Sequence, residues 1–334
     1  MSGVTTETVK DDEDGLRLDR WFKLRYPAVG FGHLQKILRT GQVRVAGKRA
    51  KASTRVEAGQ LVRIPPLPAE AEPGKPAPKR RIPDADVEFM RSLILHEDRD
   101  IFVLNKPFGI AVQGGSKTVR HIDGLLDALA SPDGERPRLV HRLDRDTAGV
   151  LVLARTRQAA SQLGKVFRSR SARKIYWALV HTVPKPAQGK INQALAKVAA
   201  ADGEKVVPVD PNDEEAMRAV TYYSVIEKAG QKFSWVSLKP VTGRTHQLRA
   251  HMALIGHPIV GDPKYGLDEI AKEGRELGGI DNKLHLMARR LVIPHPRGGT
   301  LDITAPLPEH MRRSFDRLGF DTSAYDALAE EDVD

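Results

Sequence analysis

The sequence contains no cysteine among its 334 residues. That absence excludes disulfides, iron–sulfur clusters and cysteine-based zinc sites, and it excludes a reaction through a thiol nucleophile. Long apolar runs are absent too, since no stretch approaches the ~18 apolar residues of a membrane span. The chain begins with a polar, acidic stretch over residues 1–14 that lacks the apolar core of a secretory signal. We therefore expect a cytoplasmic protein that has no membrane partner.

Motifs that bind common cofactors and metals are also missing. The sequence has no G-x-G-x-x-G fingerprint after a strand, no H-E-x-x-H and no Cys or His cluster at metal spacing. Two glycines ahead of Lys48 resemble a phosphate-binding P-loop, but five residues rather than four separate them, and Arg49 stands where Ser or Thr is required. His246 and His251 are not at a usual ligand spacing, and we interpret them as polar helix residues. We expect neither a cofactor nor a metal.

The positive charge of the chain is concentrated in one segment. The net charge is +10, from 53 basic and 43 acidic side chains, and 40% of the residues are hydrophobic, which is enough for a core. Between residues 16 and 63 there are twelve Lys or Arg and two acids, so this segment alone accounts for the excess. Such a local concentration is typical of a module that binds phosphates. The alternative is a basic face without a nucleic-acid partner.

Apolar residues in the basic segment repeat with the periods of short helices and strands. Two triplets fall at positions i, i+3 and i+4 of amphipathic helices: Leu18, Trp21 and Phe22, then Leu34, Ile37 and Leu38. The stretches LxxWFKLRYP, LQKILRTGQVRVAGK and VEAGQLVRIPP resemble the S4 RNA-binding domain. The resemblance implies a small α+β domain over residues 14–68. Its candidate RNA-binding side chains are Arg17, Arg20, Lys36, Arg39, Arg44 and Lys48.

A proline-rich stretch follows the basic segment. Seven of the chain's 22 prolines lie between Pro65 and Pro83, among Ala, Glu and Lys and without apolar periodicity. This composition predicts a semi-rigid linker over residues 69–88. We expect a second, larger domain over residues 89–322 and an acidic tail over residues 323–334.

The larger domain alternates short apolar strands with amphipathic helices. Strands are predicted at 93–96, 101–104, 150–154, 175–180, 221–227 and 233–238. Helices are predicted at 122–129, 159–167 and 248–255. Strands with interspersed helices and frequent short turns are typical of an α+β domain around a mixed, mostly antiparallel sheet.

The most distinctive stretch is HRLDRDTAG over residues 141–149, followed at once by the apolar run 150–154. Two carboxylates alternate with two arginines in a segment that leads into a buried strand, so charged groups are delivered to the edge of a sheet. We interpret Arg145 and Asp146 as partners that order the loop, and Gly149 as a turn former. Charge pattern alone leaves open an ion-paired surface loop, because such networks also perturb pKa values without any function.

Three stretches in order along the chain resemble the RluA-type pseudouridine synthases, which isomerise uridine in structured RNA. They are HRLDRDTAGVLVLAR from His141, RKIYWALV from Arg173 and VTGRTHQLRAH from Val241. A fourth stretch, NKPFG from Asn105, resembles the first motif of the same family. The resemblance covers roughly residues 90 to 320. It implies the pseudouridine synthase fold and a reaction that uses no cofactor.

The resemblance implies a role for each of four residues. Asp144 falls where the family has its catalytic aspartate, and attack on the sugar, addition to the base and proton abstraction from the sugar all stay open. Tyr176 would stack on the uracil and offer its hydroxyl for proton transfer at C5, although a tyrosine in an apolar strand is more often a core residue. Arg244 would lie beside Asp144 and favour its ionised form. Arg142 would fill the gap left by a flipped uridine or grip the neighbouring phosphate.

The remaining expectations concern the partner. The helix end at residues 165–174 holds five basic residues and no acid, so we expect Arg168 and Arg170 to face the RNA. The VRIPP ending and NKPFGIAVQGGS are most similar to family members that modify several uridines in 23S ribosomal RNA of the large subunit. Members that act on a different 23S helix are the near alternative, and a non-catalytic RNA-binding protein of ribosome assembly is the alternative from another class. We expect a monomer.

Overall fold

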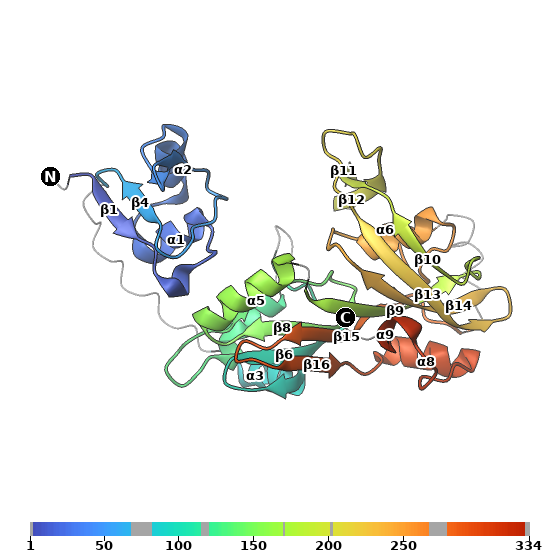
Figure 1. Cartoon of the computed structure of the whole chain (residues 1–334). Coiled ribbons are helices and arrows are strands. Elements are labelled where there is room, and N and C mark those ends of the chain that lie inside the picture. The colour runs from blue at the N-terminus through green and yellow to red at the C-terminus, as the bar shows by residue number, and fades with distance from the viewer. Residues whose placement is uncertain are drawn as a thin grey trace.

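The computed structural model describes residues 3–67, 82–114, 120–169, 171–200, 203–266 and 279–330 of the chain. A small N-terminal unit, drawn in blue, lies beside a larger body that is built on one long sheet (Figure 1). Both parts combine helices with mostly antiparallel strands, so the predicted α+β class is confirmed. Over the described residues, the helices are too short or too polar to cross a membrane.

A four-stranded sheet and two helices form the N-terminal unit. The strands pair in the order β1 (Thr5–Thr8), β4 (Leu61–Ile64), β2 (Arg44–Val45) and β3 (Lys48–Arg49). The helices are α1 (Leu18–Arg25) and α2 (Phe31–Arg39). Their predicted apolar faces are buried, through Leu18, Trp21, Phe22, Leu34, Ile37 and Leu38. Each large apolar side chain contributes about 1.5–3 kcal/mol when it is removed from water, which explains why the two triplets identified the helices.

The N-terminal unit begins earlier than residue 14, the predicted boundary. Strand β1 pairs with β4 from Thr5 opposite Ile64, so its backbone belongs to the sheet. The following turn η1 (Asp11–Glu13) also packs inward, because the buried Glu13 carboxylate accepts hydrogen bonds from Trp21 Nε1 at 3.0 Å and from Arg25 Nη2 at 2.7 Å. The polar composition of residues 5–8 does not predict a strand, because this strand depends on pairing with β4. Strand β1 and the turn η1 also bring acids into the unit, which holds thirteen basic and seven acidic residues between positions 3 and 67.

One long sheet runs through the larger body. Its strands follow the order β10 (Gln188–Asn192), β13 (Val220–Ala229), β14 (Phe233–Pro240), β9 (Arg173–His181), β15 (Leu286–Pro294), β8 (Ala148–Ala154), β6 (Ile101–Lys106) and β5 (Ile94–Glu97). Two short strands pair at its side, β16 (Thr300–Thr304) with β15 and β7 (Arg138–Leu139) with β8. Strands β15 and β8 are parallel and the other described pairs are antiparallel. A separate hairpin consists of β11 (Leu195–Ala200) and β12 (Gly203–Pro208).

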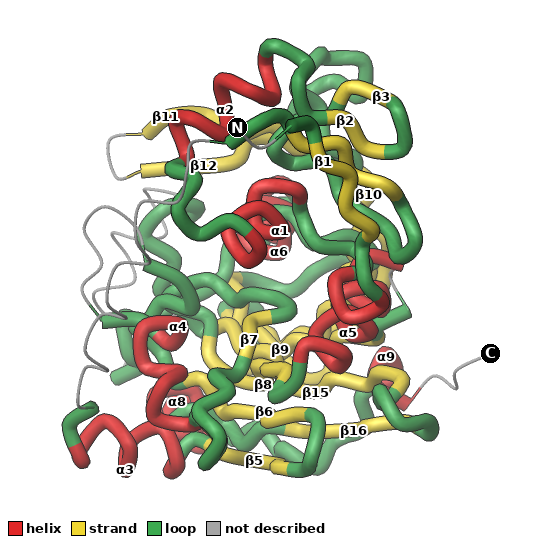
Figure 2. Tube along the Cα trace, turned by 90° about the vertical axis from the view of Figure 1, so that its left-hand side faces the viewer, coloured by secondary structure: helices red, strands yellow, loops and turns green. Residues whose placement is uncertain are grey.

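Helices pack against both faces of this sheet, and Figure 2 shows several of them around its strands. They are α3 (Asp84–Ser92), α4 (Ile122–Leu125), η2 (Leu126–Leu129), α5 (Arg157–Ser169), α6 (Gln247–Leu254), α8 (Glu309–Leu318) and α9 (Ala327–Glu330). Alternate residues of β8 enter different cores. Val150 and Val152 cluster with Leu163 of α5, whereas Leu151 and Leu153 cluster with residues of α3 and η2. All seven residues of β8 are therefore buried, and the continuous apolar run is explained by a strand covered on both faces.

Gly149 serves the sheet rather than a turn, which corrects the expectation from the sequence. It lies in β8 with φ of 105°. A Cβ atom built on it would lie 2.1 Å from the carbonyl oxygen of Ala288 on the parallel strand β15. The turn itself lies just ahead of the strand, where the amide of Thr147 donates to the carbonyl of Asp144 at 3.2 Å. Gly149 therefore allows the strand that follows the Asp144 loop to approach β15 closely.

The N-terminal unit contacts the body through α5. Lys165 Nζ lies 2.5 Å from Asp14 Oδ2, and Ser161 Oγ donates to the carbonyl oxygen of Asp14 at 2.8 Å. Arg157 faces Asp12 at 3.8 Å. The acidic stretch around η1 thus meets a basic helix, and the two parts of the chain lie against each other there.

The predicted linker and the larger domain meet at a helix. Most of the predicted linker, residues 69–81, lies outside the described residues. Residues 84–88, which the sequence assigned to the linker, form the start of α3. Pro83 precedes the helix, Asp84 and Asp86 occupy its first turn, where negative charge is favourable, and Met90 is fully buried. The larger body therefore begins before residue 89.

The predicted acidic tail is part of the body up to residue 330, which corrects the predicted end of the larger domain at residue 322. Helix α9 buries Leu328 and Ala329, and the carboxylate of Asp326 is buried ahead of it. Asp326 Oδ2 accepts hydrogen bonds from Trp177 Nε1 at 2.8 Å and from Ser237 Oγ at 2.9 Å. Acidic composition suggested a solvated end, but this carboxylate is satisfied by donors from β9 and β14. Residues 331–334 lie outside the described residues.

Candidate active site

A cleft of about 300 Å³ lies where three distant segments of the larger body meet. The loop between β7 and β8 supplies Arg142 and Asp144, strand β9 supplies Tyr176, and the segment between β14 and α6 supplies Arg244. All four residues line the cleft. The structure therefore brings together every residue of the larger domain for which the resemblance implied a role in the reaction.

A buried lysine holds the loop that carries Asp144. Lys106, at the end of β6, is fully buried, and its Nζ donates to the carbonyl oxygens of Arg145 at 2.9 Å, Pro107 at 2.9 Å and Ile110 at 2.7 Å. These three acceptors use all three protons of the ammonium group. Burial lowers the pKa of Lys106 to about 7, against the charges of Asp146 and Asp144. The lysine of the NKPFG stretch therefore ties the loop after β6 to the Asp144 loop.

His141 fixes the other end of the same loop. Its ring stacks on Phe167 of α5 with centroids 4.4 Å apart, and its Nε2 accepts the backbone N–H of Val152 at 2.9 Å. Burial lowers the pKa of His141 to about 3. The ring is thus neutral and carries its proton on Nδ1, because Nε2 is used as an acceptor. Nearby, Arg145 pairs with Asp146 at 3.1 Å, as the sequence predicted for partners that order the loop.

Tyr176 enters the cleft from the middle of the sheet. It is paired with Leu238 of β14 and with Ala288 of β15, so its backbone is fixed on both sides. Burial, together with the charge of Asp144, raises the pKa of Tyr176 far above its usual value. The hydroxyl is therefore protonated at neutral pH and can donate a hydrogen bond.

Arg244 was expected to pair with Asp144, but it has a different partner. Its Nε donates to the carbonyl oxygen of Arg218, just ahead of β13, at 3.1 Å. His246 approaches the Asp144 carboxylate instead, with its Nε2 4.0 Å from Asp144 Oδ2. Arg244 lines the cleft, but its guanidinium group donates to a backbone carbonyl. The sequence, in which Arg244 and His246 are two residues apart, does not indicate which of the two side chains faces Asp144.

Of the two histidines that the sequence suggested were polar helix residues, His251 lies on a helix and His246 does not. His246 precedes α6 in a left-handed conformation, with φ of 50°, and its Nδ1 lies 3.1 Å from the hydroxyl of Tyr265. His251 is on α6 but fully buried, where Nδ1 contacts Thr221 Oγ1 at 2.9 Å and Nε2 contacts the carbonyl of Gln193 at 3.2 Å. No pattern in the sequence distinguishes these two environments.

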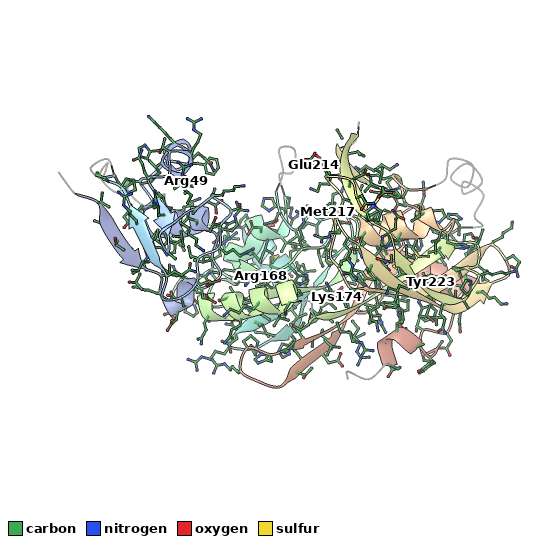
Figure 3. The ribbon with its side chains drawn as sticks, turned by 45° about the horizontal axis from the view of Figure 1, so that its top comes forward. Arg49, Arg168, Lys174, Glu214, Met217 and Tyr223 are labelled. Carbon is green, nitrogen blue, oxygen red and sulfur yellow. The ribbon has the colours of Figure 1, made fainter. Side chains whose placement is uncertain are left out.

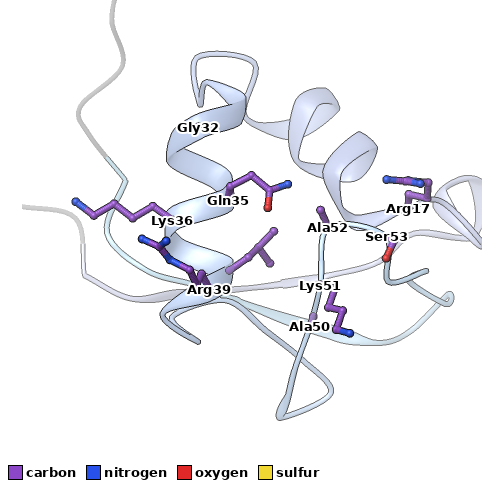
Figure 4. A pocket seen from close by; sticks show the side chains of 10 residues that line it. Arg17, Gly32, Gln35, Lys36, Arg39, Ala50, Lys51, Ala52 and Ser53 are labelled. Carbon is purple, nitrogen blue, oxygen red and sulfur yellow. The ribbon is translucent and has the colours of Figure 1, made fainter. Parts of the chain in front are cut away.

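A second hollow, of about 640 Å³, lies in the N-terminal unit (Figure 4). Three of the predicted RNA-binding side chains line it, namely Arg17, Lys36 and Arg39. Lys51 lies in the same groove and was missed, because it sits outside the helical and strand patterns. Of the other three, Arg20 is exposed on α1, and Arg44 and Lys48 are exposed on the β2 and β3 hairpin.

The basic end of α5 faces the N-terminal unit. A side chain at Gly15 would meet Arg168 Nη2 at 3.1 Å, so Arg168 lies at the contact between the unit and α5 (Figure 3). Burial, together with the charge of Arg55, lowers the pKa of Arg168. Arg168 is exposed beside the N-terminal unit, and its contact with RNA stays a prediction. Arg170 lies outside the described residues.

The described residues contain no group of three or more His, Cys, Asp or Glu side chains that could hold a metal ion. The titratable groups that line the main cleft are one carboxylate, one phenol, two imidazoles, three guanidinium groups and one lysine, namely Asp144, Tyr176, His141, His246, Arg142, Arg244, Arg249 and Lys174. Such a set can bind an anionic ligand, donate and accept protons, and present one carboxylate to an electrophilic carbon.

Comparison with known proteins gives consistent matches. Residues 100–254 match the family described as RNA pseudouridylate synthase. The Ribosomal large subunit pseudouridine synthase C of Escherichia coli is 38% identical over 317 residues, with 94% of this chain and 97% of that protein covered. The protein of the same name from Haemophilus influenzae is 36% identical, with 95% and 96% covered. The solved structure of Human RNA Pseudouridylate Synthase Domain Containing 4 has a TM-score of 0.60 at 31% identity and covers 72% of this chain and 99% of that chain.

Proposed function

The chain belongs to the RNA pseudouridylate synthase family and is an enzyme of that class, and from this premise we propose that it converts specific uridines to pseudouridine in large-subunit (23S) ribosomal RNA, with Asp144 as the catalytic carboxylate. The observation that carries the proposal is the convergence of Asp144, Tyr176 and Arg244 in one cleft from segments that lie far apart in the sequence. Two relatives that align with more than nine-tenths of the chain carry the name of a ribosomal large subunit enzyme, which supports the choice of RNA.

The reaction needs one carboxylate and no external reagent. The bond between ribose C1′ and N1 of uracil breaks, the base turns, and C1′ joins C5. C5 loses its proton and N1 gains one, so nothing is added or removed overall. A carboxylate serves as nucleophile or as base in such a sequence. Asp144 has one quarter of its side chain exposed at the cleft, so it is within reach of a ligand and partly shielded from water.

The residues around Asp144 bind the flipped uridine and its phosphate. A uridine inside structured RNA must leave its stack before it can reach the carboxylate, at a cost of a few kcal/mol. Tyr176 stacks on the uracil, and its protonated hydroxyl serves proton transfer near C5. Arg142, exposed at the rim of the cleft, takes the place of the flipped base or grips the adjacent phosphate, and Arg244 binds the phosphate or the substrate edge.

The N-terminal unit adds a second contact to RNA. Its groove of basic side chains suits a phosphate backbone, and the similarity of its sequence to the S4 RNA-binding domain supports that assignment. A second contact on the same chain raises the effective concentration of the RNA at the cleft. The proposed organisation is an RNA-binding unit from residue 5 to 67, a connecting segment, and a catalytic body from residue 82 to 330 in a monomeric, cytoplasmic protein.

Site-resolved mapping of pseudouridine in unmodified 23S rRNA tests the proposal. The rRNA is incubated with the wild type, with Asp144→Asn and with Asp146→Asn, a carboxylate in the same loop that pairs with Arg145. We expect pseudouridine at discrete positions with the wild type and with Asp146→Asn, and none with Asp144→Asn. A full signal from Asp144→Asn would overturn the role of Asp144, and no signal from the wild type on naked rRNA or on ribosomal subunits would overturn the choice of RNA.

A further inference from the structure

A chain of polar contacts leads away from Asp144 into the body. His246 Nε2 lies 4.0 Å from Asp144 Oδ2, and His246 Nδ1 lies 3.1 Å from the hydroxyl of Tyr265. The rings of His246 and Tyr265 meet edge to face with centroids 5.6 Å apart. The hydroxyl of Tyr265 in turn accepts the backbone N–H of Val206 in β12 at 2.9 Å. The β11 and β12 hairpin is thereby connected to the carboxylate through two side chains.

These contacts assign the proton on each ring. The amide of Val206 can only donate, so it occupies a lone pair of the Tyr265 oxygen and leaves the hydroxyl proton to point elsewhere. Among the described residues, His246 Nδ1 lies 3.1 Å from that hydroxyl, in position to accept a hydrogen bond from it. Burial raises the pKa of Tyr265, so the phenol keeps its proton. An imidazole that accepts at Nδ1 carries its own proton on Nε2, the atom that faces Asp144.

The surroundings of His246, burial above all, favour its neutral form. Burial lowers the pKa of His246, and Arg249 of α6 and Lys264 lower it further, against the opposing charges of Asp144 and Asp262. Arg249 is itself neutralised, because it forms two hydrogen bonds with Asp262, at 2.7 and 2.6 Å, in a pair that is almost fully buried. The carboxylate of Asp144 thus faces the neutral ring of His246, and the charge of the buried Arg249 is balanced by Asp262.

The backbone of His246 has an unfavourable conformation, so the position of its ring is maintained at a cost in conformational energy. The residue has φ of 50° and ψ of 18°, a left-handed conformation that residues with a Cβ atom seldom adopt. Strain of this kind persists where the surrounding structure fixes it, and it is common at functional sites. Here it turns the ring away from the axis of α6 and into the space between Asp144 and Tyr265.

We propose that His246 is a positioning residue for the isomerisation, a neutral imidazole whose Nε2–H, fixed by Tyr265, orients the Asp144 carboxylate. This inference rests on the proposed role of Asp144. The present gap of 4.0 Å is about 1 Å longer than a hydrogen bond, and such contacts tighten when substrate fills the site. A neutral donor fixes the direction of the carboxylate without the loss of basicity that a cationic partner would cause. Arg244 is then free to serve the RNA.

The proton assignment is tested on the free, full-length enzyme. Imidazole ¹⁵N chemical shifts distinguish a protonated from an unprotonated ring nitrogen. We expect the resonances of His246, assigned by their loss in His246→Asn, to show a protonated Nε2 and an unprotonated Nδ1 at pH 7. In Tyr265→Phe, which keeps the ring and removes the hydroxyl, we expect a mixture of the two tautomers. A proton on Nδ1 of His246 in the wild type would overturn the proposal.

Single-turnover rates on unmodified 23S rRNA test the consequence for the reaction. His246→Asn suits the left-handed backbone, because Asn adopts it more readily than most residues, and we expect its rate to fall about 10- to 100-fold with unchanged RNA affinity. His246→Gln, whose amide N–H can take the place of Nε2–H, should recover part of that loss. In Tyr265→Phe the freed Nδ1 can take up a proton, so we expect its rate to fall with acid at a higher pH than that of the wild type.

The outcomes separate this inference from the proposed function. A full rate in His246→Asn, or parallel pH profiles of Tyr265→Phe and the wild type, would overturn the role of His246. A wild type that fails to modify the RNA while its ¹⁵N shifts show the expected tautomer would overturn the proposed substrate and support the arrangement of His246 and Tyr265. Circular dichroism of each variant checks that the fold is retained.

Discussion

Trp177 and Asp326 lie 149 residues apart and form a buried hydrogen bond, with Trp177 Nε1 donating to Asp326 Oδ2 at 2.8 Å. The same carboxylate oxygen accepts from Ser237, which is paired with Trp177 across β9 and β14. Tyr176 is the neighbour of Trp177 and points into the cleft, so successive residues of β9 serve opposite faces of the sheet. The C-terminal segment therefore stabilises β9, the strand that carries Tyr176, from the face opposite the cleft.

Replacement of Asp326 with Ala should destabilise the protein strongly. The change leaves the Trp177 indole and the Ser237 hydroxyl without their partner, and hydrogen bonds to a buried charged group are worth roughly 1.5–3 kcal/mol each. We expect the free energy of unfolding in urea to fall by about 3 kcal/mol or more. Asp316→Ala, at an exposed position on α8, should change it by no more than about 0.5 kcal/mol. Equal effects at the two sites would contradict this account.

Substitution of Gly149 with Ala should be far more costly than substitution of Gly59. Both glycines have positive φ, 105° and 81°, so either change forces a Cβ atom into an unfavourable conformation at about 1 kcal/mol. At Gly59 nothing lies within 4 Å of the new atom, whereas at Gly149 the carbonyl oxygen of Ala288 lies 2.1 Å away. We expect Gly149→Ala to lose at least about 3 kcal/mol of unfolding free energy. A loss at Gly149 no larger than at Gly59 would show that β8 and β15 are not held this close.

Stability should fall as the pH drops below 6.5 because of buried histidine. His285 is fully buried between Ser314 and the carbonyl of Lys283, and burial, with the charge of His310, lowers its pKa to about 4. Between pH 6.5 and 4 the unfolded chain binds the proton and the folded protein does not. Stability is therefore complete above pH 6.5 and decreases below it by about 1.4 kcal/mol per pH unit for each such group. His141 acts in the same direction.

Urea titrations between pH 5 and pH 8 measure this dependence. His285→Gln keeps a polar side chain without the titration, so its free energy of unfolding should depend less steeply on pH than that of the wild type. The difference between the two slopes should approach one proton near pH 5. Identical slopes would exclude His285 as a source of the acid sensitivity.

Removal of charge from the groove in the N-terminal unit should weaken RNA binding in a salt-dependent way. The triple substitution of Lys36, Arg39 and Lys51 with Ala removes three cations from one hollow. Each lost phosphate contact reduces the slope of log K against log salt by about 0.7–0.9. We expect the slope for an unmodified 23S rRNA fragment to fall by about 2 to 3, with weaker binding at low salt.

A triple substitution on α8 provides a control of matched charge. Arg312, Arg313 and Arg317 are exposed on that helix and lie outside both hollows. Their replacement with Ala removes the same net charge, and we expect it to leave most of the salt slope in place. If the two triple variants bind RNA alike, total charge rather than the groove governs affinity.

Much of the fold and part of the site followed from the sequence. The helices of the N-terminal unit were predictable because Leu18, Trp21 and Phe22 already define a single buried face within two turns. Strand β8 was predictable because a strand covered on both faces must be continuously apolar. The cluster of Asp144, Tyr176 and Arg244 was identified through three motif stretches, and the structure brings these into one cleft.

Other features depend on partners that no local pattern reveals. Strand β1 has the polar sequence TTET, and it is a strand because β4 supplies its hydrogen bonds from about fifty-five residues away. Asp326 lies in an acidic stretch, and it is buried because donors from β9 and β14 meet it there. Composition describes a segment in water, whereas burial depends on what the rest of the chain places against it.

The sequence by itself determined the family of the chain, the class of its fold, the charge of its N-terminal segment and the carboxylate at the centre of the proposed site. Only the tertiary structure decided which base faces Asp144, because the direction of a side chain depends on backbone angles and on distant acceptors. Arg244 turns to the carbonyl of Arg218, and the left-handed backbone at His246 turns its ring toward the carboxylate. The sequence would be the same if Arg244, rather than His246, faced Asp144. The choice between these two arrangements depends on contacts with β12, Tyr265 and the segment ahead of β13.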